Sequence, residues 1–174
     1  GFAEPNAWLV LTGDGKSTLF CQPKDLEREI WDGIRLGPEA APAALGVDEA
    51  WSVDELDARL PKLLENTATV WYPFATHAGL ESRIDGWLQK VRARVRYGAL
   101  APEAQRDVCT ILDEMRLIKD AHELDLMRRA AQISARAHIR AMQRSAAMLR
   151  AGEDVREYHL DAELLHGFRQ HGSQ

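Results

Sequence analysis

The stretch DAHELDLMRRAAQISARAHIRAMQRSAAML, residues 120–149, decides the fold of the second part of this 174-residue chain. Asp120 and Glu123 form a capping-box pattern, which marks the first turn of a helix. Polar side chains then recur at steps of three and four along one narrow stripe: Asp125, Arg129, Gln132, Arg136, Arg140 and Gln143. Most of the remaining circumference is Leu, Met, Ile and Ala. The stretch therefore predicts a helix of about 30 residues that is covered on more than one side.

Helical patterns flank this stretch on both sides. Residues 103–118 carry apolar side chains at helical spacing, and a last helix is expected from Val155 to Phe168, with its cap at Asp154 and its end at Gly172. No strand pattern follows residue 102, so these broad apolar faces have no sheet of their own to cover them. We expect them to pack on another layer, supplied by the earlier part of the chain, by a second copy or by sequence outside this chain.

The first 100 residues predict a small α/β sheet with packed helices. Apolar runs over residues 7–12 and 17–21, joined by Asp14-Gly15, predict a β-hairpin, and residues 68–72 predict a third strand. Helices are expected over residues 26–31, 56–64 and 76–95, with a capping box from Ser52 to Glu55 before the second, and a loop is expected over residues 38–46. Three strands are few for such a sheet, so a further strand is expected before Gly1.

Composition and charge argue against several kinds of partner. The net charge is −5, with 22 basic and 27 acidic residues well mixed, so the basic surplus of a nucleic-acid-binding domain is missing. No apolar run approaches the roughly 18 residues that span a bilayer, and the start of the chain has no signal-peptide pattern. Cys21 and Cys109 lie far apart and predict buried thiols. A reducing, cytoplasmic setting is therefore expected.

Residue patterns that carry catalysis are missing from the sequence. His159, His166 and His171 lie in one helical region, but their spacings of seven and five do not converge on one metal ion. No HExxH, GxSxG, GxGxxG or zinc pattern is present. The sequence therefore assigns no catalytic residue and no metal ligand. Trp31 stands out, because it precedes a glycine-rich loop and lies between Glu29 and Asp32. A tryptophan side chain in such a sequence is usually packed in the core. If the Trp31 indole is exposed, it would cover a ligand or a partner subunit.

The run DEMRLIKDAHEL, residues 113–124, continues to Arg128-Arg129-Ala130 and resembles the domain junction of Xaa-Pro aminopeptidases and their prolidase and creatinase relatives. Other stretches are similar to bacterial aminopeptidase P: GFAEP at residues 1–5, IWDGIRLG at 30–37, AAPAALGV at 40–47, and Arg150-Ala151-Gly152 followed by Glu157-Tyr158-His159-Leu160. The resemblance implies an N-terminal α/β domain over residues 1–118, incomplete at its start. It implies that residues 119–174 are the first helices of a truncated pita-bread catalytic domain.

This resemblance also implies the chemistry of a parent enzyme. Such an enzyme is a metallopeptidase that removes the N-terminal residue from peptides with proline in the second position, and it uses two manganese ions. The five metal ligands of the family (two Asp, one His and two Glu) match no position in this chain, so the fragment itself is expected to be inactive and to bind no metal. The parent is expected to be a homotetramer. In the bacterial enzymes a tryptophan matching Trp31 reaches the active site of a neighbouring subunit, and an arginine matching Arg96 lies near the extended substrate path.

Two alternatives to an aminopeptidase P remain open at this point. One is a prolidase or creatinase relative, although the stretch from Ile30 to Gly37 argues against it. The other is a non-catalytic, peptidase-like module that binds proteins, as in the large subunit of a histone chaperone. Retention of the five metal ligands in the full-length sequence would indicate an enzyme, and their loss would indicate a binding module.

Overall fold

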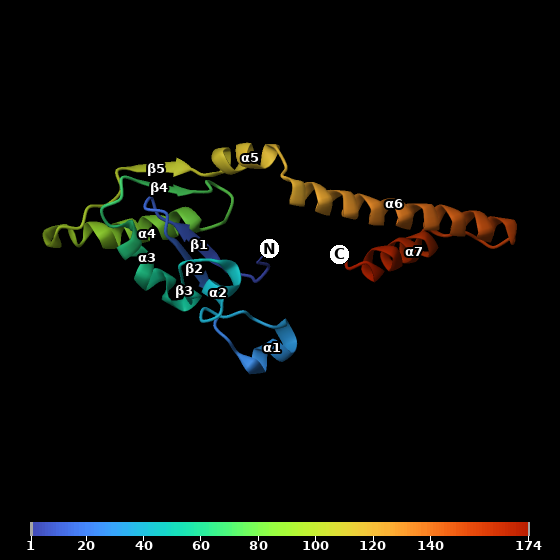
Figure 1. The fold of residues 1–174 in the computed structure, drawn as a ribbon, viewed down its shortest axis with the longest axis horizontal. Coiled ribbons are helices and arrows are strands. Elements are labelled where there is room, and N and C mark those ends of the chain that lie inside the picture. Colours follow the sequence, from blue (N-terminus) through green and yellow to red (C-terminus); the bar gives the residue numbers. More distant parts are fainter. Residues whose placement is uncertain (1, 174) are drawn as a thin grey trace. The chain divides into compact units, whose positions relative to one another are not determined.

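The computed structural model describes residues 2–173 of the chain. The chain divides into two compact units, Gly1–Ile111 and Leu112–Gln174, and the division falls inside helix α5 (Cys109–Leu117). The first unit is mixed α/β, as the sequence predicts, and the second is helical (Figure 1). The domain boundary at residues 118 and 119 that the family resemblance implies stays a prediction.

A three-stranded sheet lies in the first unit, in the order β1-β2-β3. The predicted hairpin is confirmed: β1 (Trp8–Leu11) runs antiparallel to β2 (Ser17–Cys21), with Trp8 opposite Phe20. Strand β3 (Glu49–Ser52) runs parallel to β2 and was not predicted. Its sequence, EAWS, is too short to show an alternating pattern of its own, and the strand forms because β2 offers a free edge beside it.

A second sheet pairs β4 (Thr69–Tyr72) with β5 (Ala104–Asp107) in parallel. Strand β4 is the predicted third strand. The helix expected over residues 103–118 is wrong in its first part, where strand β5 forms; the helix there is α5, and it begins only at Cys109. The predicted α/β class is confirmed, but the number of strands within the chain was underestimated, because the described residues form five strands in two sheets.

The helices of the first unit follow the predicted order with two corrections. They are α1 (Leu26–Asp32), α2 (Ala41–Leu45), η1 (Val53–Glu55), α3 (Leu56–Leu64), α4 (Leu80–Arg92) and η2 (Val95–Tyr97). Helix α2 lies in the predicted loop. The capping box at Ser52 is also wrong, because the Ser52 hydroxyl accepts from the amide of Asp54 and begins the 3-10 turn η1, while Glu55 pairs with Arg59 at 2.8 Å.

One hydrophobic core joins both sheets to α3 and α4. Its fully buried side chains include Phe20 from β2, Leu56 from α3 and Trp87 from α4, and Tyr72 from β4 packs into the same cluster. In the described residues, β1 pairs only with β2, and β4 pairs only with β5. The two sheets therefore share a core while each keeps an edge without a partner strand.

The second unit contains α6 (Ala121–Arg150) and α7 (Glu157–Gln170), packed against each other. The predicted capping box is confirmed, since Asp120 accepts from the amide of Glu123 at 2.8 Å and Glu123 accepts from the amide of Asp120 at 2.9 Å. The cap of α7 differs from the prediction: it is Arg156 rather than Asp154, and the Arg156 amide donates to Nδ1 of His159.

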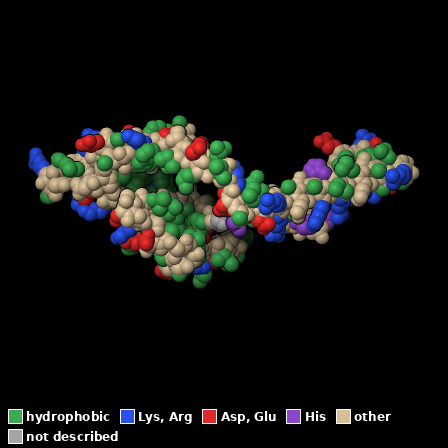
Figure 2. All heavy atoms as spheres, turned by 45° about the horizontal axis from the view of Figure 1, so that its top comes forward, with side chains coloured by type: hydrophobic (Ala, Val, Ile, Leu, Met, Phe, Trp, Pro, Cys, Tyr) green, Lys and Arg blue, Asp and Glu red, His purple; other side chains and the backbone are tan. Residues whose placement is uncertain are grey.

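Much apolar surface of α6 and α7 is uncovered, as the sequence predicts. Only four residues of α6 are buried: Ile133, Ala137, Ala141 and Met148. Large apolar side chains exposed on the two helices are Leu124, Leu126, Met127, Ile139, Met142, Leu149, Tyr158 and Leu165. Figure 2 shows hydrophobic side chains along the surface of these helices. A search of residues 2–173 finds no helix long and apolar enough to cross a membrane.

Candidate functional site

Helix α1 presents an apolar face to solvent. Asp25 caps the helix by accepting from the amide of Arg28 at 3.1 Å, and Gly33 ends it with a backbone φ of 90°. The Trp31 side chain is 87% exposed, and Leu26, Ile30 and Ile34 are exposed beside it. Figure 1 shows α1 standing clear of the sheet and of α3 and α4. Exposed apolar side chains gathered in this way mark an interaction surface.

Residues 24–37, called here the α1 arm, are closed at their base by polar contacts. Lys24 pairs with Glu29 at 3.3 Å. Arg35 pairs with Asp32 at 3.3 Å and donates to the Pro23 carbonyl at 3.5 Å. The Arg35 side chain, on the returning part of the arm, is mostly buried, and its bond to the Pro23 carbonyl joins the returning chain to the segment that leads into the arm.

Two further features fix the point where the arm rejoins the body of the unit. A carboxylate oxygen of Glu4 accepts from the amide of Leu36 at 2.6 Å. Gly37 has a φ of 77°, and a Cβ added there would lie 2.9 Å from Cγ of Lys24. Only glycine therefore allows the returning chain to pass this close to Lys24.

Arg96 lies in a basic segment at the end of α4. Within residues 90–97, Lys90 donates to the Asp57 carbonyl at 3.0 Å and Arg94 pairs with Glu65 at 2.7 Å. Arg96 itself lies in η2, is exposed, and makes no ion pair with any described residue. An exposed, unpaired guanidinium is suited to binding a carboxylate or a peptide carbonyl.

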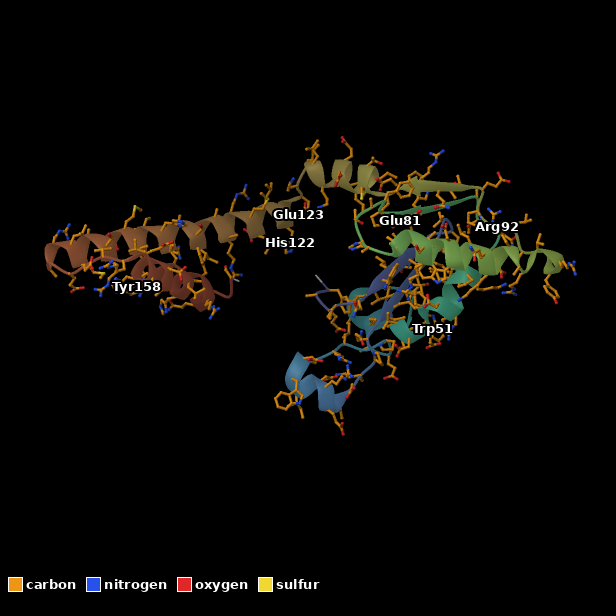
Figure 3. The ribbon with its side chains drawn as sticks, turned by 180° about the vertical axis from the view of Figure 1, so that it is seen from behind. Trp51, Glu81, Arg92, His122, Glu123 and Tyr158 are labelled. Carbon is orange, nitrogen blue, oxygen red and sulfur yellow. The ribbon has the colours of Figure 1, made fainter. Side chains whose placement is uncertain are left out.

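A shallow surface groove of about 410 Å³ lies next to η2. Its lining is mainly apolar, with one basic and one acidic side chain: Arg92, Val95, Ala99, Leu100, Ala101, Pro102 and Glu103. Arg92 projects from the last turns of α4 (Figure 3). Arg96 does not line this groove, and the structure does not bring Arg96 and Trp31 together, since η2 and α1 lie well apart in the first unit (Figure 1).

Two of the histidines contact the backbone carbonyl four residues earlier in the chain. Nδ1 of His138 contacts the Ser134 carbonyl at 2.8 Å, and Nδ1 of His171 contacts the Gly167 carbonyl at 2.9 Å. No group of three or more His, Cys, Asp and Glu side chains that could hold a metal ion exists within residues 2–173. The described residues therefore do not fit a metal site. Cys21 is a buried thiol, and burial, with Glu4 nearby, raises its pKa.

The sequence alone points to Trp31 and Arg96 but not to the residues around them. A helix was expected over residues 26–31, and in the structure its apolar side chains Leu26 and Ile30 are exposed together with Trp31. Nothing near Glu4 in the sequence indicates its role, because its partner Leu36 is 32 residues away. Contacts of this kind become visible only in the folded chain.

The chain is similar in sequence to a known protein family and to several curated proteins. Residues 1–71 match the family described as the N-terminal domain of aminopeptidase P. The chain is 38% identical over 178 residues to the Xaa-Pro aminopeptidase of Escherichia coli K12, an alignment that covers 100% of this chain and 39% of that protein. It is 34% identical over 151 residues to human Xaa-Pro aminopeptidase 3, covering 82% of this chain and 29% of that protein.

Solved structures give the same relationship. The chain matches the structure of Pseudomonas aeruginosa aminopeptidase PepP with a TM-score of 0.87 and 37% identity, covering 99% of this chain and 38% of that one. It matches a variant of Escherichia coli aminopeptidase P solved in complex with substrate with the same TM-score and identity. The chain thus spans about two fifths of the length of these relatives.

Proposed function

Because the chain belongs to the Xaa-Pro aminopeptidase family, we propose that it is the N-terminal part of an enzyme that removes the N-terminal residue from peptides with proline in the second position. The observation that carries this proposal is the 38% identity to an Xaa-Pro aminopeptidase, which extends over the whole chain and so includes both units. A match to the N-terminal family alone would cover only residues 1–71.

In this proposal, the catalytic metal ions bind to residues outside 2–173. The family that the sequence resembles uses a pair of manganese ions, and residues 2–173 contain no cluster of ligands that fits one ion. We therefore assign no step of peptide hydrolysis to a residue of this chain. In this proposal, residues 2–173 alone are inactive and support the catalytic part.

The uncovered helices support this division of roles. Exposed apolar side chains on α6 and α7, such as Leu126, Met142 and Tyr158, would pack against the catalytic part of the enzyme. Burying each of these side chains would contribute about 1.5–3 kcal/mol relative to leaving it in water. Such a gain is large enough to hold the two parts together.

Trp31 and Arg96 are proposed to bind the peptide substrate. Trp31 would do so across a contact between subunits of a homotetramer, because α1 carries it on an exposed apolar face well suited to a protein interface. Arg96 would act on its own, near the outer end of a longer peptide. A cytoplasmic location is also proposed, since the buried thiol of Cys21 suits a reducing compartment.

Cleavage of matched peptides by the full-length protein tests this function. The pair would be two tripeptides that differ only in proline or alanine at the second position, with an N-acetylated proline peptide as the control for aminopeptidase action. We expect release of the first residue from the free proline peptide at least a hundredfold faster than from the other two. Equal rates on the proline and alanine peptides would refute the Xaa-Pro assignment, and no cleavage of either would favour a non-catalytic module.

A further inference from the structure

We propose that Glu4 is a positioning residue whose carboxylate fixes the direction of the α1 arm, and through it the place of Trp31 in substrate binding. The part of this proposal that concerns substrate rests on the function proposed for Trp31 above. The part that concerns the arm rests only on contacts within the first unit.

The hydrogen bond from the Leu36 amide to the Glu4 carboxylate is short, and the second oxygen of that carboxylate is buried. Oε1 of Glu4 accepts from the Leu36 amide at 2.6 Å, and Oε2 of Glu4 is buried without a hydrogen-bond partner among the described residues. A carboxylate with a buried oxygen is costly to keep in place unless its remaining bond is strong. Charge-assisted bonds to backbone amides are about twice as strong as neutral ones.

Leu36 is the point at which the arm returns to the sheet. Its side chain packs, together with Phe2, against the buried side chains of Leu19 and Cys21. Glu4 therefore lies between two segments that meet on this cluster: the start of the chain and the returning end of the arm. The angle at which the arm leaves the body depends on how the Leu36 backbone is held.

The other side-chain contacts of the arm are made within it or to the residue just before it. Lys24 with Glu29, and Arg35 with Asp32, join residues that belong to the arm itself, and the Arg35 contact to the Pro23 carbonyl closes its base. These contacts keep α1 in shape and tie the arm to Pro23, the residue next to it in sequence. The Glu4 side chain instead links the returning end of the arm to the start of the chain, 32 residues away in sequence, and this long-range bond is the one that holds the direction of Trp31.

Three variants of the full-length protein separate positioning from general stability. Glu4→Gln keeps an oxygen at the same reach, Glu4→Asp shortens the side chain by one methylene and withdraws the acceptor, and Glu4→Ala removes it. We expect the Leu36 amide to exchange its hydrogen at least tenfold faster in the Asp and Ala variants than in the parent, and less than tenfold faster in the Gln variant, whose neutral oxygen still accepts but makes a weaker bond. We expect KM for a proline-containing peptide to rise about threefold to tenfold in the same two variants, with kcat within twofold.

A double-mutant comparison tests whether Glu4 acts through Trp31. If it does, Glu4→Asp made in a Trp31→Ala protein causes no further rise in KM. Asp48→Ala is the matched control, because the Asp48 carboxylate also accepts from a distant backbone amide, that of Ser17 at 2.8 Å, but its side-chain bonds within the described residues go to Ser17 and not to the arm. We expect this control to leave both KM and Leu36 exchange within twofold of the parent.

The outcomes distinguish this proposal from the proposed role of Trp31. Unchanged Leu36 exchange in both Glu4→Asp and Glu4→Ala would overturn the positioning of the arm. An equal rise in KM from Glu4→Asp with and without Trp31 would show that Glu4 does not act through Trp31, and would overturn the second half of the proposal. If Trp31→Ala alone leaves KM unchanged, the substrate role of Trp31 fails, and faster exchange of Leu36 and of α1 would still uphold the positioning of the arm.

Discussion

The carboxylate of Asp57 in α3 accepts a hydrogen bond of 2.7 Å from the indole N–H of Trp87 in α4, whose side chain is only 2% exposed. The same carboxylate oxygen pairs with Arg83 at 3.0 Å. Trp87 also packs edge-on against Trp8 of β1, with ring centroids 5.7 Å apart. Asp57 therefore joins two helices at the place where α4 meets the sheet.

Replacing Asp57 with Ala should destabilise the first unit by about 1 kcal/mol, because the Trp87 N–H then loses its acceptor. The figure is at the low end for a bond to a charged group, since the Asp57 side chain is itself 56% exposed. Urea unfolding followed by tryptophan fluorescence measures the change. Asp54→Ala is the control, because Asp54 makes only a local contact with Ser52. Equal stabilities of the two variants would contradict the role given to Asp57.

The stability of the unit should also fall at low pH through Asp57. Its hydrogen bonds to Arg83 and Trp87 hold its folded pKa below the ordinary value of 3.8. The ionised carboxylate therefore contributes its stabilisation above about pH 4, and this contribution is lost as the pH falls through the folded pKa. The stability difference between the parent and Asp57→Asn should shrink over this acid range. A difference that stays constant from pH 6 to pH 2 would contradict this account.

Two helix glycines should respond to alanine in opposite directions. A Cβ at Gly167 of α7 would lie 2.8 Å from Cβ of Ala137 in α6, so Gly167→Ala should force the helices apart and cost about 1–3 kcal/mol. A Cβ at Gly86 of α4 meets nothing within 4 Å, so Gly86→Ala should stabilise by up to about 1 kcal/mol through helix propensity. Thermal unfolding of the full-length protein measures both. Stabilisation by Gly167→Ala would contradict the close packing of α6 on α7.

Arg96 should affect long peptides more than short ones. If it lies near the outer end of the substrate, Arg96→Ala should raise KM by up to about fivefold for peptides of several residues, the effect expected for losing one exposed charge contact. KM for the shortest substrates should not change. Arg92→Ala is the matched control, because it removes an equally exposed guanidinium from the end of α4. The same KM in both variants for every peptide would contradict a substrate role for Arg96.

The elements that were predicted correctly are those whose starts and ends depend on residues close to each other in the sequence. Asp120 caps α6 as expected, because a cap involves residues only three apart. The helix expected at residue 76 starts later, at Leu80, since Gly79 adopts a φ of 81°. Helix α2 was missed although its signals were present: Pro42 lies in its first turn, and Gly46 closes it in the left-handed conformation.

The strands that the sequence missed depend on distant partners. Strand β5 has the sequence AQRD, and it becomes a strand because β4 pairs with it, Tyr72 opposite Asp107. A four-residue polar strand has almost no pattern of its own. The residues of the candidate site also differ in whether the sequence alone could reveal them. Trp31 was visible from its neighbours in sequence, whereas Glu4 became visible only through its contact with Leu36.

Metal content of the full-length protein tests most directly the claim that residues 2–173 support the reaction without holding its metal ions. The protein and a His159→Ala/His166→Ala/His171→Ala variant, which lacks the histidines grouped near α7, would be dialysed against manganese and their metal content measured. We expect two ions per chain in both proteins, with activity lost to a chelator and restored by manganese. A variant that binds fewer ions than its parent, or a parent that binds none, would contradict this account.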